Sequence, residues 1–538
     1  MKLYRLFLVA LAGAAIAASC TKMEDIAPQS GTMLESQVQK TNEIAPSRAE
    51  ASFNGMFTNI GKPAKMYSNP DDWEFLMILF CNDLEGADAH IADSGYNWFS
   101  VCGELSSRNA NYRNPYIRYR APYNMIADVN TFLAGFSEDV SDPSSINMIA
   151  QARCLRAYSY MMLVPNYQFN YQIAKDKPCV PICSPDVEDV THNPRATVAE
   201  IYDIIINDLS YAIDNLGTDR KTKAYINSNV AHGLRARAYL EMGEWQKAYD
   251  DAVAAAQGYE PASIAEVSKP AFMNINEHNW IWGYAMTADV AANYLYATSS
   301  SWLRSFSANG YAPACQVYTC INTILWDKIP ATDIRKQWWV DEDLHSTISD
   351  ELEWPGLGPV ATADDGGDTK LPFLPYTNVK FGCDPIGTIS NEEDMPLMRV
   401  EEMILIQAEC QYRLGQSAAA VSTLESFVQG YRDPEYVYDA SRFPSFIEEI
   451  WFQRRVELWG EGFFIPDQRR LQKPLVRFID DTNNIAPAFR FNLAADDPWL
   501  LLRFPQGEMN TNFDIVDNTG GNQPKTDQGK GIFDGVTD

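Results

Sequence analysis

Two stretches of the chain, ARAYLEMGEWQKA at residues 236–248 and AECQYRLGQSAAA at residues 408–420, share one pattern of small residues. In each, an alanine is followed seven positions later by a glycine, and five positions after that by a second alanine. Small residues let two helices approach closely, and a glycine can adopt the backbone conformation that a tight turn between them requires. The pattern therefore predicts an antiparallel helix pair around each glycine.

Small residues at the helix contact and a glycine at the turn are typical of a tetratricopeptide helix pair. Another kind of antiparallel helix hairpin could place alanine, glycine and leucine at similar positions, so that alternative stays open. Residues 147–166 and residues 197–216 also carry apolar side chains at three- and four-residue spacing. The sequence thus predicts a mainly α-helical scaffold.

Residues 261–395 differ in character from the segments on either side. Proline, glycine, serine, threonine, asparagine and aromatic residues dominate there, which indicates short strands and long loops. Loops held on a rigid scaffold often carry binding sites. We therefore divide residues 49–538 into a helical part (49–260), a loop-rich insert (261–395) and a second helical part (396–538).

The N-terminus reads as a secretory signal peptide at residues 1–19. Two basic residues precede an apolar run at residues 6–18, which is too short to span a bilayer comfortably. The run ends in AASC at residues 17–20, which resembles a bacterial lipobox; this resemblance makes Cys20 the lipid-attachment residue. The alternative is an ordinary signal peptide with a chance cysteine. Residues 20–48 are polar with few aromatics, and we expect a flexible tether there.

The composition excludes several classes of protein. The chain has 538 residues, of which 46% are hydrophobic and 12% aromatic, so it can bury a large core and is not disordered. Its formal net charge of −28 makes binding to nucleic acid or to an anionic lipid surface improbable.

Nine cysteines follow Cys20, and their odd number and scattered positions do not indicate a disulfide framework. Cys179 with Cys183, and Cys315 with Cys320, could each close a small loop, but we expect mostly buried thiols. No histidine accompanies either pair at zinc spacing. We therefore expect no metal site and no cofactor.

No familiar catalytic or nucleotide-binding motif is present, and the five histidines are isolated from one another. A pair of catalytic carboxylates is harder to exclude, because a glycosidase needs only two acids close together and residues 82–93 form a dense acidic run. The charged cluster at residues 454–470 has locally balanced signs, which favours structural ion pairs. We expect no catalytic residues and a protein that is not an enzyme.

Four segments, taken in order along the chain, together resemble the SusD/RagB family of Bacteroidetes outer-membrane lipoproteins. Each motif alone is degenerate, but the ordered set is specific. Gln453, where the family often has glutamate, and Gly507 depart from its pattern. The segments are QARCLRAYSY (151–160), LMRVEEMILIQAE (397–409), QRRVELWGEG with the following DQRR (453–470), and LLRFPQGEMNTN (501–512).

This resemblance implies a fold, a location and partners. The fold would be an all-α scaffold of tetratricopeptide-like pairs with an irregular second half. The protein would be lipid-anchored in the outer membrane, facing the cell surface. It would capture glycans or other nutrient oligomers and deliver them to a SusC-like TonB-dependent transporter.

The candidate ligand site follows from the chemistry of sugars and from this resemblance. A pyranose ring offers an apolar face and a hydroxyl rim, so its site needs flat exposed rings and a few polar partners. In the family the ligand site is drawn from two regions, one near the acidic run and one in the insert; the alternative for each aromatic is a place in the core. The candidate residues are Asp83, Asn97, Trp98, Tyr294, Tyr296, Trp302 and Arg304.

Three other functions remain open at this point. The same fold could capture peptides or amino sugars, or serve only as a structural lid of the transporter. A surface glycoside hydrolase is the third. Calorimetry against a panel of glycans would separate binding from the others.

Overall fold

The computed structural model of the chain describes residues 35–538 except 45, 92–96, 186, 293, 295, 353–372 and 481–482. The predicted signal peptide and the predicted lipid-attachment residue Cys20 lie outside the described residues. Within the described part, no helix combines the length and the apolar composition that are needed to cross a bilayer.

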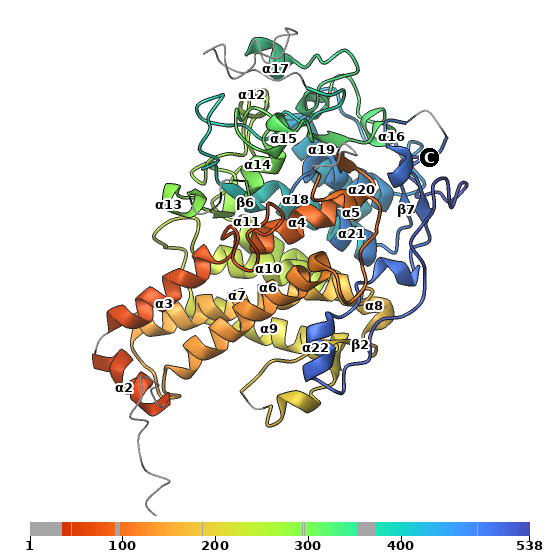
Figure 1. Cartoon of the computed structure of the whole chain (residues 1–538). Coiled ribbons are helices and arrows are strands. Elements are labelled where there is room, and N and C mark those ends of the chain that lie inside the picture. The colour runs from red at the N-terminus through yellow and green to blue at the C-terminus, as the bar shows by residue number, and fades with distance from the viewer. Residues whose placement is uncertain are drawn as a thin grey trace, which may run out of the picture.

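Long helices stack side by side and form the scaffold (Figure 1). Helix α7 packs between α6 and α9, and α9 packs on α10. Their bounds are α6 Arg113–Ala134, α7 Pro143–Tyr167, α9 Val198–Asn215, α10 Ser228–Met242, α11 Trp245–Ala256, α18 Val400–Arg413, α19 Ser417–Tyr431, α20 Phe446–Glu457 and α21 Phe464–Arg470.

Two helix pairs surround the glycines of the repeated pattern. α10 and α11 meet at Gly243, and α18 and α19 meet near Gly415; both glycines are left-handed, with φ of 78° and 79°. α11 packs directly on α18, although the insert separates them in the chain. The predicted mainly α-helical scaffold of tetratricopeptide-like pairs is confirmed.

Helix α7 is longer than its expected range of 147–166. Asp142 caps it, because its carboxylate accepts a hydrogen bond from the backbone N–H of Ser145 at 2.8 Å. The helix continues through Pro165 and ends at Tyr167.

Part of residues 20–48, for which a flexible tether is expected, is helical. Helices α2 (Glu35–Ile44) and α3 (Pro46–Thr58) occupy this segment. The amide nitrogens of Gln39 and Asn42 donate to the backbone oxygens of Ala134 and Gly135, at 3.0 and 2.9 Å. These polar side chains therefore dock α2 on the end of α6.

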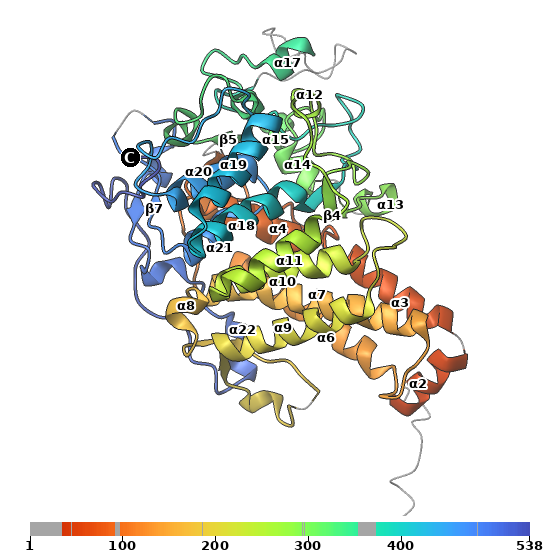
Figure 2. The ribbon, with the colours of Figure 1, turned by 180° about the vertical axis from the view of Figure 1, so that it is seen from behind.

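The insert contains short helices and loops above the long helices (Figures 1 and 2). Antiparallel pairing of β4 and β6 brackets most of it, and pairing of β1 and β5 joins it to the N-terminal part. The strands are β1 Ala89–Ile91, β2 Pro178–Pro181, β3 Arg195–Thr197, β4 Trp280–Tyr284, β5 Thr319–Ile321, β6 Met395–Arg399, β7 Leu475–Val476 and β8 Asn492–Leu493. The short helices in and around the insert are α12 Ile264–Val267, α13 Ala288–Ala291, α14 Ser299–Leu303, α15 Tyr311–Ala314, α16 Thr323–Trp326, η2 Ile334–Trp338 and α17 Thr347–Glu351.

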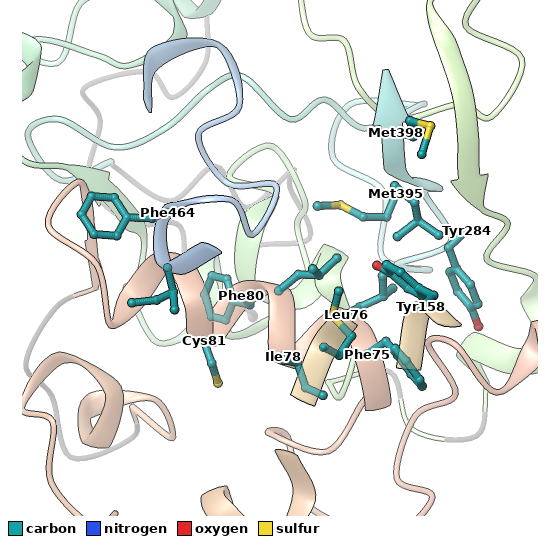
Figure 3. Packing of buried hydrophobic residues seen from close by; sticks show 14 of the residues in the cluster. Phe75, Leu76, Ile78, Phe80, Cys81, Tyr158, Tyr284, Met395, Met398 and Phe464 are labelled. Atoms are coloured by element: carbon teal, nitrogen blue, oxygen red, sulfur yellow. The ribbon is translucent and has the colours of Figure 1, made fainter. Parts of the chain in front are cut away.

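Helix α4 (Glu74–Leu84) runs through the core, and all of its residues are buried. The ring of Phe75 stacks on that of Tyr158 of α7, with 5.7 Å between the ring centres. Figure 3 shows both residues among the buried side chains around α4. Tyr158 in turn contacts Trp282 of β4 edge-on at 5.0 Å. One continuous apolar core therefore joins the helical scaffold to the insert.

The remaining short elements are α5 Ser100–Gly103, α8 Tyr171–Ala174, η1 Val190–His192, η4 Pro487–Phe489, η5 Pro498–Leu500 and α22 Gln506–Thr511.

A group of ionised side chains is buried where β6, α18 and α20 meet, and we call it the buried charge network. Arg399 donates to Glu457 at 3.0 Å and to Glu461 at 2.8 Å. Arg432 also holds Glu457 through two bonds of 2.8 Å. Burial alone would raise the pKa of Glu457, but the facing arginines keep it well below its usual range. The members are Arg335, Lys380, Arg399, Glu401, Arg432, Glu457 and Glu461.

The neighbouring charged cluster at residues 454–470 is also ion-paired, as expected. Arg454 and Arg470 each contact Asp467 at 2.7 Å, and Arg455 contacts Asp88 at 2.5 Å. Arg469 differs, because it donates to the backbone oxygen of Leu500 at 2.9 Å. These charges hold the scaffold together.

Candidate functional site

Trp98 and the insert meet at one place on the surface. The indole Nε1 of Trp98 donates a hydrogen bond to the hydroxyl of Tyr311 at 3.0 Å, across 213 residues of sequence. Trp98 is half-buried and follows β1, whose pairing with β5 brings this segment to the insert. Asn97 is buried, and its side-chain oxygen accepts the backbone N–H of Phe99 at 2.9 Å, so it shapes the turn that presents Trp98.

Tyr311 covers Trp302. The two rings are parallel within 10° and their centres lie 4.5 Å apart. Trp302 has no exposed surface, its indole donates to the backbone oxygen of Pro70 at 3.1 Å, and Phe99 packs edge-on against it at 4.8 Å. Trp302 is predicted to contact ligand, but the structure makes it the buried support of Tyr311.

The position of Tyr311 depends on close contact between α14 and α15. The backbone N–H of Tyr311 donates to Ser301 Oγ at 3.0 Å. A Cβ atom at Gly310 would lie 2.9 Å from Ser301 Cα and 3.0 Å from its carbonyl oxygen. A glycine therefore allows the two short helices to meet and sets the height of the Tyr311 ring.

Tyr294 and Tyr296 extend the aromatic surface. The ring of Tyr296 lies 6.3 Å from that of Tyr294 and 5.9 Å from that of Tyr311, in both cases edge to face. Tyr296 is 41% exposed, and Tyr294 is half-buried. We call Trp98, Tyr294, Tyr296 and Tyr311 the aromatic platform. Its rings can pack on the apolar face of a ligand, and its hydroxyls can bind a polar rim.

Arg113 lies at the edge of the aromatic platform. Its guanidinium is 5.0 Å from the centre of the Trp98 ring and donates to Asp71 Oδ2 through Nη2 at 2.7 Å and Nε at 3.1 Å. The Arg113 side chain is one-third exposed, at 33%. Burial raises the pKa of Asp71, and its bonds to Arg113 oppose that change. The pair thus places a fixed cation beside Trp98 that can bind hydroxyl or acidic groups.

A second pair of aromatics continues beyond Arg113. The rings of Tyr67 and Tyr116 lie 5.8 Å apart, edge to face, and Tyr67 is 36% exposed. Burial raises the pKa of the Tyr67 hydroxyl, and the nearby charge of Arg113 partly opposes that change. The sequence does not indicate Arg113, Tyr67 or Tyr116 as site residues, because nothing in their local sequence separates them from other polar and aromatic residues.

Two further predicted ligand residues have structural roles. Asp83 is buried, and its carboxylate accepts the backbone N–H groups of Gly462 at 2.7 Å and Phe464 at 3.3 Å. Burial raises its pKa to about 7. Arg304 is 1% exposed and donates to the backbone oxygens of Gly382, Phe272 and Asp394 at 2.6, 3.0 and 2.5 Å. Neither side chain reaches the aromatic platform's surface.

A separate cavity of about 80 Å³ lies among α7, α10 and α21. Ion pairs line part of it, including Arg237 with Glu402 at 2.6 Å and Arg454 with Asp467 at 2.7 Å. Burial raises the pKa of Glu241, another lining residue, to about 8. None of the residues that line the cavity belongs to the aromatic platform. Among the described residues, no group of three or more histidine, cysteine, aspartate or glutamate side chains is arranged to hold a metal ion.

Two family profiles match the chain. The profile described as starch-binding and associating with the outer membrane matches residues 39–240. The profile described as the SusD family matches residues 327–530. The two matches together cover most of the chain and leave residues 241–326 between them.

Individual relatives and solved structures agree with these matches. The chain is similar to SusD-like protein P2 of Formosa agariphila, with 23% identity over 427 residues that cover 74% of this chain and 79% of the relative. It superposes on a SusD-like carbohydrate-binding protein of Bacteroides vulgatus with a TM-score of 0.69 and 22% identity, covering 88% of this chain and 98% of that one. A laminarin-binding SusD-like protein superposes with a TM-score of 0.61 and 17% identity, covering 88% and 99%. These similarities confirm the fold.

Proposed function

The chain belongs to the SusD/RagB family, and from this premise we propose that it binds glycans or other nutrient oligomers at the cell surface and is not an enzyme. The observation that carries the proposal is the aromatic platform. Trp98 and Tyr311 come from distant parts of the chain, are joined by a hydrogen bond, and rest on a buried tryptophan. Such rings are rigid before a ligand arrives, so binding costs little side-chain entropy.

The chemistry of the platform suits a saccharide. Aromatic faces bind the apolar faces of sugar rings, while the tyrosine hydroxyls and Arg113 can bind the hydroxyl rim. Two of the similar structures are described as carbohydrate-binding and laminarin-binding proteins, which supports a glycan ligand here. Capture needs affinity and release, and no stabilisation of a transition state.

The location and the partner extend the proposal. We infer that Cys20 carries the lipid anchor, that the folded part faces the outside of the outer membrane, and that ligand passes to a SusC-like TonB-dependent transporter. The family profile described as associating with the outer membrane supports this location. The transporter follows from the family resemblance and is tested by co-purification from solubilised membranes.

Calorimetry of the protein lacking residues 1–20 tests the binding itself. A panel of plant, algal and host glycans is titrated, and at least one should bind. Trp98→Ala should weaken that ligand at least about tenfold, which corresponds to about 1.4 kcal/mol. The matched control is Phe513→Ala, which removes an aromatic that is 67% exposed and lies away from the platform. This variant should bind the glycan with the affinity of the wild type.

The other outcomes identify the alternatives. Binding of peptides or amino sugars alone would keep the site and change the ligand class. Failure to bind any ligand while the transporter still co-purifies would indicate a structural lid. Release of reducing ends from a glycan would show a hydrolase and overturn the proposal.

A further inference from the structure

Two buried cysteines are in contact close to the segment that carries Trp98. Cys81 of α4 and Cys102 of α5 have their Sγ atoms 3.5 Å apart, and the residues are 0% and 1% exposed. The side-chain nitrogen of Asn114, on α6, lies 3.6 Å from each sulfur. The structure describes both cysteines as free thiols.

The geometry of this contact is close to that of a cross-link. A disulfide bond is about 2.05 Å long, so the sulfurs need to approach by only about 1.5 Å. Rotation about a Cα–Cβ bond moves a sulfur atom by about this amount, so the two side chains themselves can supply part of the approach. The cysteines are 21 positions apart, and a bond between them would close the segment that links α4 to α5.

We propose that Cys81 and Cys102 form a disulfide bond in the exported protein. The proposal rests on the proposed location, because disulfides form and persist outside the cytoplasm. The thiolate of one cysteine attacks the disulfide of an envelope thiol–disulfide oxidoreductase, and the second thiolate displaces that enzyme from the mixed disulfide. Both thiols lose a proton, the pair loses two electrons, and the oxidoreductase leaves as a dithiol.

The bond forms before α4 and α5 close on each other. In the folded chain the contact with Cys81 and burial both raise the pKa of Cys102 well above its usual range, so a thiolate is scarce. Burial also keeps an oxidoreductase away from either sulfur. For the same reasons, the bond resists reduction once the protein has folded.

The cross-link would fix the segment that presents Trp98. α5 begins directly after Phe99, whose ring packs on Trp302 below Tyr311. Binding Cys102 to α4 therefore limits how far Trp98 and Phe99 can move from the insert. The bond acts as a structural clamp on one side of the aromatic platform.

Differential alkylation tests the proposal. The full chain is purified from the cell envelope, denatured with a light alkylating reagent, then reduced and treated with a heavy one. Peptide mass spectrometry should find the heavy label on Cys81 and Cys102 and the light label on the other seven described cysteines. Light label on both members of the pair would overturn the proposal.

A stability measurement distinguishes the bond from ordinary packing. Reductant should lower the melting temperature of the wild-type protein and of Cys154→Ser, whose cysteine is buried elsewhere. It should leave Cys102→Ser unchanged, because that variant has no bond to reduce. Equal reductant sensitivity of Cys102→Ser and Cys154→Ser would contradict the proposal.

Refolding separates this proposal from that of the function. Protein made in the cytoplasm is refolded with oxidised glutathione and mapped in the same way. A Cys81–Cys102 bond formed there supports the geometry even if the chain proves not to be exported. If the refolded chain lacks the bond as well, the cross-link is wrong whatever the location.

Discussion

The buried charge network and the aromatic platform use strong interactions in opposite ways. In the network, Glu457 receives bonds from Arg399 and Arg432, and the side chains of both arginines have no exposed surface. In the platform, Tyr296 is 41% exposed and Trp98 is half-buried, so ring surface remains uncovered. A group whose bonding capacity is used within the chain stabilises the fold. A group that is rigidly held but left uncovered is available to a ligand.

Removing one member of the network should produce the largest effect. Glu457→Ala leaves the buried charges of Arg399, Arg432 and Arg335 without their shared partner. Breaking a buried pair costs about 3–5 kcal/mol, and this site loses several contacts, so we expect a loss of about 5 kcal/mol in the free energy of unfolding. Denaturant titration measures it.

The matched control for this variant is a surface pair. Glu244→Gln removes an ion pair with Lys247 whose side chains are 46% and 58% exposed, and it should cost less than about 0.5 kcal/mol. Equal losses in the two variants would show that the network contributes no more than surface charges. Protein that remains folded should keep its ligand affinity, because the network does not touch the platform.

Glu74 provides a second test, because it is a buried acid without the partners that Glu457 has. It is 0% exposed, neither oxygen accepts a hydrogen bond, and Lys65 lies 3.9 Å away. Burial raises its pKa from 4.5 to about 8. The native state therefore holds a proton that the unfolded chain releases. The contribution of this bound proton to the free energy of unfolding is fully present below about pH 4.5 and is lost as the pH rises through about 8.

The expected loss is about 4 kcal/mol across that range, at about 1.4 kcal/mol per pKa unit. Glu74→Gln should remove this part of the pH dependence of unfolding, because the amide cannot ionise. Glu50→Gln changes an exposed glutamate on α3 and should leave the profile as it is. A profile for Glu74→Gln that matches the wild type between pH 5 and pH 8 would show that Glu74 is not protonated in the native state.

Tyr311 combines both properties, because its ring rests on the buried Trp302 and the residue itself is half-buried. Tyr311→Ala removes the ring that stacks on Trp302 and accepts the bond from Trp98. We expect a loss of about 2 kcal/mol in binding, or about thirtyfold in Kd, since both a contact face and the anchor of Trp98 disappear. Calorimetry with the best glycan of the panel measures it. Unchanged affinity would move the ligand site away from this platform.

Much of the fold could be predicted because its signals are local. Gly243 and Gly415 mark their turns through their own backbone preference, and the helices around them carry a visible period. The site depends on contacts between distant residues. Asp83 lies beside aromatic residues in the sequence, which predicts a ligand group, but its carboxylate binds the backbone of Gly462, 379 residues away, and of Phe464 at the start of α21.

For the same reason, the sequence does not show which aromatic rings of the insert are exposed to a ligand. The regions around Trp98 and Tyr296 could be selected, but composition does not show which ring lies above another. Trp302 and Tyr311 are both aromatic residues of the insert, and only the structure shows that Trp302 is buried while Tyr311, stacked on it, is half-buried. The exposed surface of a ring is a property of the assembled fold.

The smallest predicted effect isolates one hydrogen bond within the platform. Tyr311→Phe keeps the ring on Trp302 and removes the hydroxyl that accepts the indole N–H of Trp98 at 3.0 Å. One such bond contributes about 1 kcal/mol, so Kd should rise about fivefold, less than for Tyr311→Ala. The loss should come from a looser Trp98, and tryptophan fluorescence anisotropy of the free protein should fall. If Tyr311→Phe and Tyr311→Ala weaken binding equally, the hydroxyl contacts the ligand directly and the ring face contributes little.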